Sequence, residues 1–130
     1  MTTSTALLFL AVLLIGHTLA DFTPLQSRGM LQAKARASFN GIVPHGLVHG
    51  LMVGVITLLF GFGYVLALVL LSIELFIHTF TDWAKAQLSV RYQSFADPTT
   101  QWYWTLLGID QLCHTLTKVL IVCIVYSYQA

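Results

Sequence analysis

Charged residues are scarce in this sequence, and their scarcity indicates where the protein resides. Only 8% of the 130 residues are charged and 57% are apolar, whereas about 25% of the residues in an ordinary soluble domain are charged. Apolar runs of about 20 residues are long enough to cross a bilayer as helices. The sequence therefore predicts an integral membrane protein, surrounded by membrane lipids and without a separate soluble domain.

Basic residues and cysteines are also few, and each shortage excludes a class of protein. The net charge is only +1, so the chain offers no basic surface for a nucleic-acid partner. No glycine-rich phosphate loop follows a strand-like run, which argues against a nucleotide site. Cys113 and Cys123 would lie about 15 Å apart on one helix, which is too far for a disulfide.

Four hydrophobic stretches predict an all-α fold, in which residues 1–130 form a single transmembrane domain. The four expected spans are residues 5–22, 44–61, 64–82 and 101–126. Pro44 suits a first helical turn, and a short interfacial helix is expected in the basic stretch between the first two spans, with its basic residues toward the lipid head groups. The stretch 94–100 is expected to be a loop. Close helix approach is expected at four glycines, Gly50, Gly54, Gly61 and Gly63.

The start of the chain also resembles a secretory signal peptide, with a cleavage site after Ala20. No Lys or Arg precedes the apolar run, although a signal peptide has a basic segment there. We therefore expect the first stretch to be a membrane span.

The basic residues predict the orientation of the spans. Arg28, Lys34 and Arg36 lie between the first two spans, and Lys85 and Arg91 lie between the last two. Short connections rich in Lys and Arg stay in the cytoplasm. Both termini are therefore expected outside the cytoplasm.

Every histidine belongs to one of four pairs with a four-residue spacing. The pairs are His17 and Asp21, His45 and His49, His78 and Asp82, and Asp110 and His114. Side chains four residues apart lie on one helical face, so each pair can point two ligand-type groups into a bundle. Antiparallel spans bring all four pairs toward the cytoplasmic end. Because ionisable groups are costly inside a membrane and usually functional there, the pairs predict a metal site.

The spacing along each helix sorts these residues by depth, since four residues advance about 6 Å. The shallower layer is Asp21, His45, Asp82 and Asp110, and the deeper layer is His17, His49, His78 and His114. Eight candidates suit two divalent ions with about four ligands each, which we favour, or one ion with carboxylates that hold the rings. Zinc is the first choice of metal, with manganese and iron as alternatives. One step deeper, Glu74 and Lys118 are expected to form a buried ion pair.

The four pairs together resemble a known family. The segment His17-Thr-Leu-Ala-Asp21-Phe22, with His45-x-x-x-His49, His78-x-x-x-Asp82 and Asp110-Gln-x-x-His114, is similar to small bacterial and phage integral membrane proteins of unknown function. More loosely, it resembles bacterial membrane-bound metal-dependent hydrolases. The resemblance implies a bacterial inner membrane and supports a metal, while it leaves the substrate open.

Three functions are compatible with these residues. The first, which we favour, is a membrane-embedded metal-dependent hydrolase that acts on a lipid-linked or phosphoester substrate, with Asp82 or Asp110 as the catalytic proton acceptor. The second is a metal-ion transporter or channel, although nothing polar continues beyond Glu74 and Lys118. The third is a non-enzymatic phage or bacterial protein with a structural metal, whose partner is a host membrane protein or a second copy of the chain.

Overall fold

The computed structural model describes residues 1–22 and 25–129, and these residues form helices and turns with no strand. The helices are α1 (Thr3–Phe22), α2 (Arg28–Ala35), α3 (Phe39–Leu59), α4 (Tyr64–Arg91), α5 (Gln93–Ala96) and α6 (Gln101–Tyr128). Four of them, α1, α3, α4 and α6, are long and apolar enough to cross a membrane. The expected all-α bundle with four such helices is confirmed.

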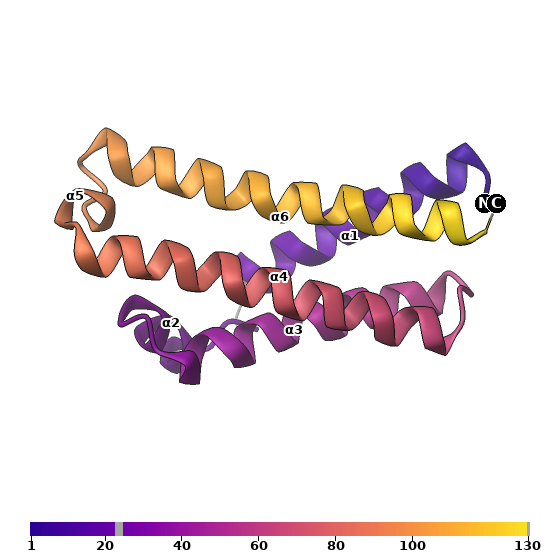
Figure 1. The fold of residues 1–130 in the computed structure, drawn as a ribbon, viewed down its shortest axis with the longest axis horizontal. Coiled ribbons are helices and arrows are strands. Elements are labelled where there is room, and N and C mark those ends of the chain that lie inside the picture. Colours follow the sequence, from indigo (N-terminus) through magenta and orange to yellow (C-terminus); the bar gives the residue numbers. More distant parts are fainter. Residues whose placement is uncertain (23–24, 130) are drawn as a thin grey trace.

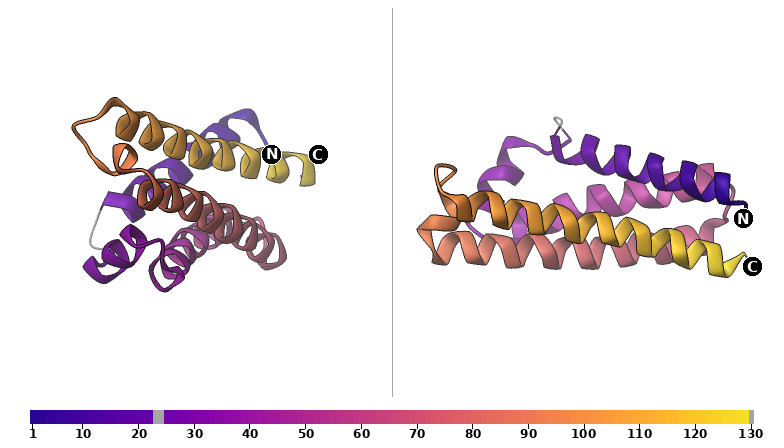
Figure 2. Two further views of the ribbon diagram at one scale, coloured as in Figure 1. Left: turned by 60° about the vertical axis from the view of Figure 1, so that its left-hand side comes forward. Right: turned by 90° about the horizontal axis from the view of Figure 1, so that it is seen from above.

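The four long helices lie side by side, each packed against two others. α3 contacts α1 and α4, and α6 also contacts α1 and α4. The short helices α2 and α5 lie at one end of the bundle, and both chain termini lie at the other end (Figures 1 and 2). The alternating direction of the long helices therefore brings the connections rich in basic residues to a single end.

One helix boundary and one expected loop differ from the sequence prediction. α3 begins at Phe39 rather than at Pro44, because the side chain of Ser38 accepts a hydrogen bond from the backbone N–H of Asn40 and caps the helix there. Pro44 consequently lies inside α3. α4 extends without a break from the expected span, which ends at residue 82, through the amphipathic stretch that follows it to Arg91. The stretch 94–100, expected as a loop, contains most of α5.

Three glycines on α3 form a seam that faces α4. A Cβ atom added at Gly46 would overlap the Thr79 hydroxyl, and one added at Gly50 would lie 3.0 Å from the carbonyl oxygen of Leu71. Gly54 continues the seam against α4. Small residues four apart let membrane helices approach closely, so the expectation of close helix approach is confirmed at Gly50 and Gly54.

Gly61 and Gly63 lie at the expected break between the second and third spans. Their φ angles are +76° and +86°, and a Cβ added at either would meet nothing within 4 Å. Such backbone conformations are readily accessible only to glycine. These two residues therefore form the turn between α3 and α4, and the prediction that they permit helix approach is wrong.

The interior of the bundle changes character along its length. Near the termini it is filled by a cluster of buried apolar side chains, Phe9, Leu13, Val53, Ile56, Leu66, Leu70, Ile121 and Val125. We call this the apolar half. Toward α2 and α5 the interior is filled by buried histidines and carboxylates, and we call this the polar half. The candidate site occupies the polar half.

Candidate metal centre

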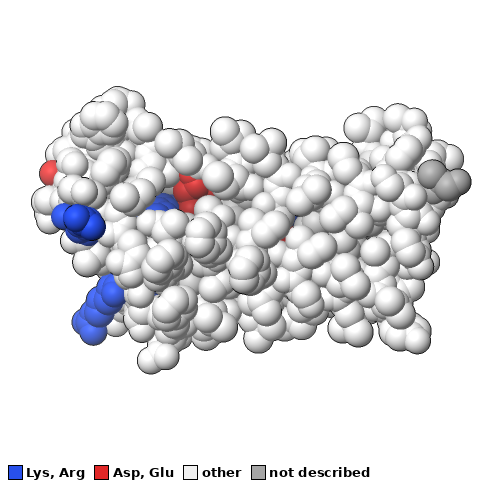
Figure 3. All heavy atoms as spheres, viewed as in Figure 1, with Lys and Arg blue, Asp and Glu red and all other residues white. Residues whose placement is uncertain are grey.

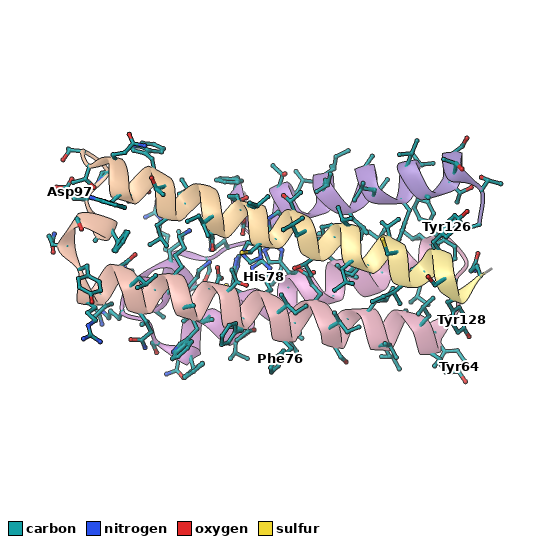
Figure 4. The ribbon with its side chains drawn as sticks, turned by 45° about the horizontal axis from the view of Figure 1, so that its top comes forward. Tyr64, Phe76, His78, Asp97, Tyr126 and Tyr128 are labelled. Atoms are coloured by element: carbon teal, nitrogen blue, oxygen red, sulfur yellow. The ribbon has the colours of Figure 1, made fainter. Side chains whose placement is uncertain are left out.

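The four sequence pairs converge in the polar half. Their eight residues, His17, Asp21, His45, His49, His78, Asp82, Asp110 and His114, are called the His/Asp centre. All five histidines are at most 5% exposed, and each of the four long helices contributes one pair. Figure 4 shows His78 in the middle of the bundle with other nitrogen-bearing side chains around it. The helical spacing in the sequence thus becomes one contiguous buried cluster.

The histidine rings contact one another directly. The ring of His78 stacks between those of His49 and His114, with centroid distances of 3.8 and 4.0 Å. Nδ1 of His17 lies 3.1 Å from Nδ1 of His49. His78 therefore lies at the centre of the histidine cluster and touches groups from three other helices.

Asp21 is shared by two histidines of α3. Its Oδ1 atom lies 3.1 Å from Nε2 of His45 and 3.1 Å from Nε2 of His49. Its Oδ2 atom lies 3.4 Å from Nε2 of His17 and accepts a hydrogen bond of 3.3 Å from the amide of Gln111. One carboxylate from α1 thus brings together three imidazoles.

The other two aspartates lie slightly farther from the rings. Oδ2 of Asp82 is 3.7 Å from Nε2 of both His45 and His78, and its Oδ1 is 3.7 Å from Nε2 of His114. Oδ1 of Asp110 is 3.5 Å from Nε2 of His114. These separations exceed the usual 2.7–3.2 Å of a hydrogen bond. They match the roughly 3.4 Å between donor atoms that bind one tetrahedral ion at about 2.1 Å.

Three groups of donor atoms are compact enough to hold an ion, each with all members within 4.8 Å of one another. The groups are His17, His49, Glu74 and His78; Asp21, His45, His49 and His78; and His78, Asp82 and His114. Seven of the eight predicted residues occur in these groups, together with Glu74, and His78 occurs in all three. Asp110 belongs to none of the groups found in the described part of the chain.

The expected ion pair between Glu74 and Lys118 is confirmed, and it has a further partner. Lys118 Nζ lies 2.5 Å from Glu74 Oε1, and both side chains are at most 1% exposed. The same oxygen lies 3.2 Å from Nδ1 of His78. With Nδ1 facing this carboxylate, Nε2 of His78 faces the aspartates, where it has no hydrogen-bond partner among the described residues. A carboxylate behind an imidazole is the usual way to orient a metal-binding histidine.

Two lysines that the sequence analysis assigned to the membrane surface and to a connection also reach the centre. Lys34 of α2 lies 2.7 Å from Oδ2 of Asp82, and Lys85 of α4 lies 2.7 Å from Oδ2 of Asp110. The expectation that Lys34 points toward lipid head groups is therefore wrong, because α2 packs against α3 and α4. For Lys85 the sequence did hold a signal. It lies three residues after Asp82, so both side chains are on one helical face.

Fold and site together define a class of protein, a four-helix membrane-type bundle with a buried histidine and carboxylate cluster. Residues 9–130 match the model of the family described as "Protein of unknown function (DUF3307)", and the chain belongs to that family. No curated protein and no solved structure matches the chain. The predicted membership in a family of unknown function is confirmed, and the looser similarity to hydrolases stays a prediction.

Proposed function

We propose that the His/Asp centre binds divalent metal ions and that the protein is a metal-dependent hydrolase of the membrane. The observation that carries this proposal is the spacing of Asp82, whose oxygens lie 3.7 Å from three imidazole nitrogens. All three separations are too long for good hydrogen bonds, and those to His78 and His114 suit donor atoms that share one ion. Nε2 of His78 is buried with no hydrogen-bond partner among the described residues. Buried polar groups are normally satisfied, and an ion would satisfy this nitrogen.

The donor geometry favours two ions with separate ligand sets. Because Nδ1 of His78 faces Glu74, Nε2 is the free nitrogen. It lies 3.7 Å from Asp82 Oδ2, and ligand atoms of His78, Asp82 and His114 lie within 4.8 Å of one another. We assign these three residues to one ion. Asp21, His45 and His49 would hold the second, with His17 beside them. Zinc suits these imidazole and carboxylate donors, and manganese or iron would also bind them.

The remaining aspartate is suited to proton transfer. Asp110 is held by Lys85 and stays outside the compact donor groups of the described residues, yet it lies beside His114. Bound divalent ions supply an activated water and polarise a substrate oxygen. Asp110 would accept the proton of that water, while Lys34 and Lys85 provide positive charge near an anionic substrate. This division sharpens the sequence prediction, which left Asp82 and Asp110 as equal candidates.

The position of the basic residues supports a defined orientation in a bacterial inner membrane. Several basic side chains are visible at the end of the molecule that holds α2 and α5, away from the termini (Figure 3). Under the positive-inside rule this end faces the cytoplasm, and both termini lie outside it. A reporter that is active only in the cytoplasm should be inactive when fused at Gln129. Activity of that fusion would reverse the orientation.

The apolar half argues against a metal-ion channel or transporter. Phe9, Leu70 and Ile121 are fully buried there, and the cluster they belong to fills the bundle between the centre and the termini. An ion that left the His/Asp centre in this direction would lose its ligands without replacement, which is costly in an apolar medium. A site that is closed toward the termini suits chemistry at the centre better than passage of an ion through the bundle.

Metal analysis of purified protein tests the proposal. After chelator-free purification we expect close to two ions per chain. Asp82→Asn should remove about one ion, whereas Asp110→Asn should retain both and abolish hydrolysis of phosphoesters. If the parent protein holds metal but hydrolyses no phosphoester, the centre is a structural metal site and the hydrolase proposal is wrong. Absence of stoichiometric metal, with His49→Ala folding as well as the parent, would overturn the metal centre altogether.

A further inference from the structure

A small groove lies between α4 and α6 and reaches the His/Asp centre from the side. It has a volume of about 200 Å³, and its lining includes Phe80, Leu106, Ile109, Cys113, Lys85 and Asp110. Apolar side chains form most of its lining, and the Lys85–Asp110 ion pair supplies its charged groups. In Figure 3 an acidic patch and a basic patch lie together over the face between α4 and α6. The groove is therefore amphiphilic.

Asp110 connects this groove to the centre. Its Oδ2 atom accepts a hydrogen bond of 2.7 Å from Lys85. Its Oδ1 atom is buried without a hydrogen-bond partner among the described residues and lies 3.5 Å from Nε2 of His114. A molecule in the groove that displaced Asp110 from Lys85 would stand next to the candidate ligands. The groove therefore borders the His/Asp centre on the side that faces the bilayer.

A larger groove between α3 and α4 lacks these properties. It has a volume of about 560 Å³, and its lining contains no charged residue and no member of the His/Asp centre. Its polar groups are the hydroxyls of Ser72 and Thr79 and the indole N–H of Trp83. In a bilayer such a hollow accepts any acyl chain without selecting a head group, so size alone does not identify the functional groove.

We propose that the α4–α6 groove is the entrance for a phosphorylated membrane lipid, whose phosphate binds Lys85 in place of Asp110. The inference rests on the proposed function and adds its substrate class and route. Lys85 has 31% of its side chain exposed and can turn toward the groove. Because a phosphate monoester carries up to two negative charges and three acceptor oxygens, it competes well with one carboxylate for this ammonium group. The exchange would release Asp110 toward His114.

The dimensions and exposure of the groove favour a lipid over a soluble phosphoester. Binding sites that enclose a whole small molecule usually measure about 300–1,000 Å³, so a groove of about 200 Å³ would hold only a head group or a chain segment. The remainder of a lipid would stay in the bilayer. Ile109 on the rim is 54% exposed on a helix long and apolar enough to span the membrane, so the groove opens toward acyl chains.

A groove-filling substitution tests this entrance. Ile109→Trp would occupy the groove, and Leu112→Trp is its control, because Leu112 is 56% exposed on the same helix and does not line the groove. Binding of dioleoyl phosphatidate from phosphatidylcholine nanodiscs would be measured by native mass spectrometry, with diacylglycerol and inorganic phosphate as comparison probes. We expect Ile109→Trp to weaken phosphatidate binding at least tenfold, with Leu112→Trp equal to the parent.

The lysine provides a second, independent variant. Lys85→Ala should also weaken phosphatidate binding about tenfold, whereas Arg91→Ala, at the end of α4, should have little effect. Three outcomes would each overturn the proposed entrance. They are equal binding of phosphatidate and diacylglycerol, tighter binding of inorganic phosphate than of phosphatidate, and unchanged phosphatidate binding in both groove variants. Metal content is measured on the same samples. Metal with no selective lipid binding refutes only the entrance, and lipid binding without metal refutes only the proposed centre.

Discussion

The two halves of the bundle are built from the same four helices and are stabilised in opposite ways. In the apolar half, side chains such as Phe9, Leu70 and Ile121 pack without polar contacts. Inside a bilayer this packing gains dispersion energy, and lipid tails compete with it because they are equally apolar. In the polar half, histidines and carboxylates bring their own desolvation cost. Residues that are expensive to bury indicate function more strongly than residues that pack well.

The boundary between the two halves is the ion pair of Glu74 and Lys118, and breaking it should have the largest effect. Lys118→Met leaves a buried carboxylate without its counter-ion, and we expect a loss of about 3–5 kcal/mol in unfolding free energy. The double variant with Glu74→Gln should recover much of that loss. Thermal unfolding of the parent, Lys118→Met, Glu74→Gln and the double variant in detergent measures these losses. Additive losses in the double variant would mean that the two side chains act independently.

A second test separates the halves by their response to metal. Zinc at about 100 times its Kd should raise the unfolding free energy of the parent by about 2.7 kcal/mol. His78→Ala should lose this increment, because His78 belongs to all three donor groups. Val53→Ala in the apolar half should be less stable than the parent yet keep the full zinc increment. An equal zinc increment in His78→Ala and Val53→Ala would show that zinc does not bind at the His/Asp centre.

Much of this arrangement was predictable from the sequence because it follows helical periodicity. The four pairs and the match in depth between Glu74 and Lys118 need only the 1.5 Å rise of a helix and alternating spans. The inward reach of Lys34 was not predictable. It depends on Gly41, where an added Cβ would lie 2.6 Å from the carbonyl oxygen of Met30, so that α2 lies tightly against α3. Such a contact between a short helix and its neighbour produces no periodic pattern in the sequence, so it could not be predicted from periodicity.

A third test asks whether the glycine seam holds the polar half together. Gly50→Val would force its side chain against the carbonyl oxygen of Leu71 and should cost roughly 1–3 kcal/mol. Gly108→Val is the control, because a Cβ at Gly108 meets nothing within 4 Å. Its stability should be close to that of the parent. Thermal unfolding of both variants without metal makes the comparison. Equal losses of unfolding free energy would show that α3 and α4 can move apart at the seam without a specific cost.

The smallest expected effect concerns Lys34, and its direction is informative. Lys34 lies 2.7 Å from Oδ2 of Asp82, an atom that we assign as a metal ligand. A cation at this carboxylate must compete with the ammonium group, since like charges at short range repel even when partly screened. Lys34→Ala should therefore tighten zinc binding by a few-fold, which corresponds to about 1 kcal/mol or less. Arg36→Ala at the end of α2 is the control and should leave the affinity unchanged. Titration of the apo-protein measures both, and weaker zinc binding by Lys34→Ala would mean that Lys34 orients Asp82 for the ion instead of competing with it.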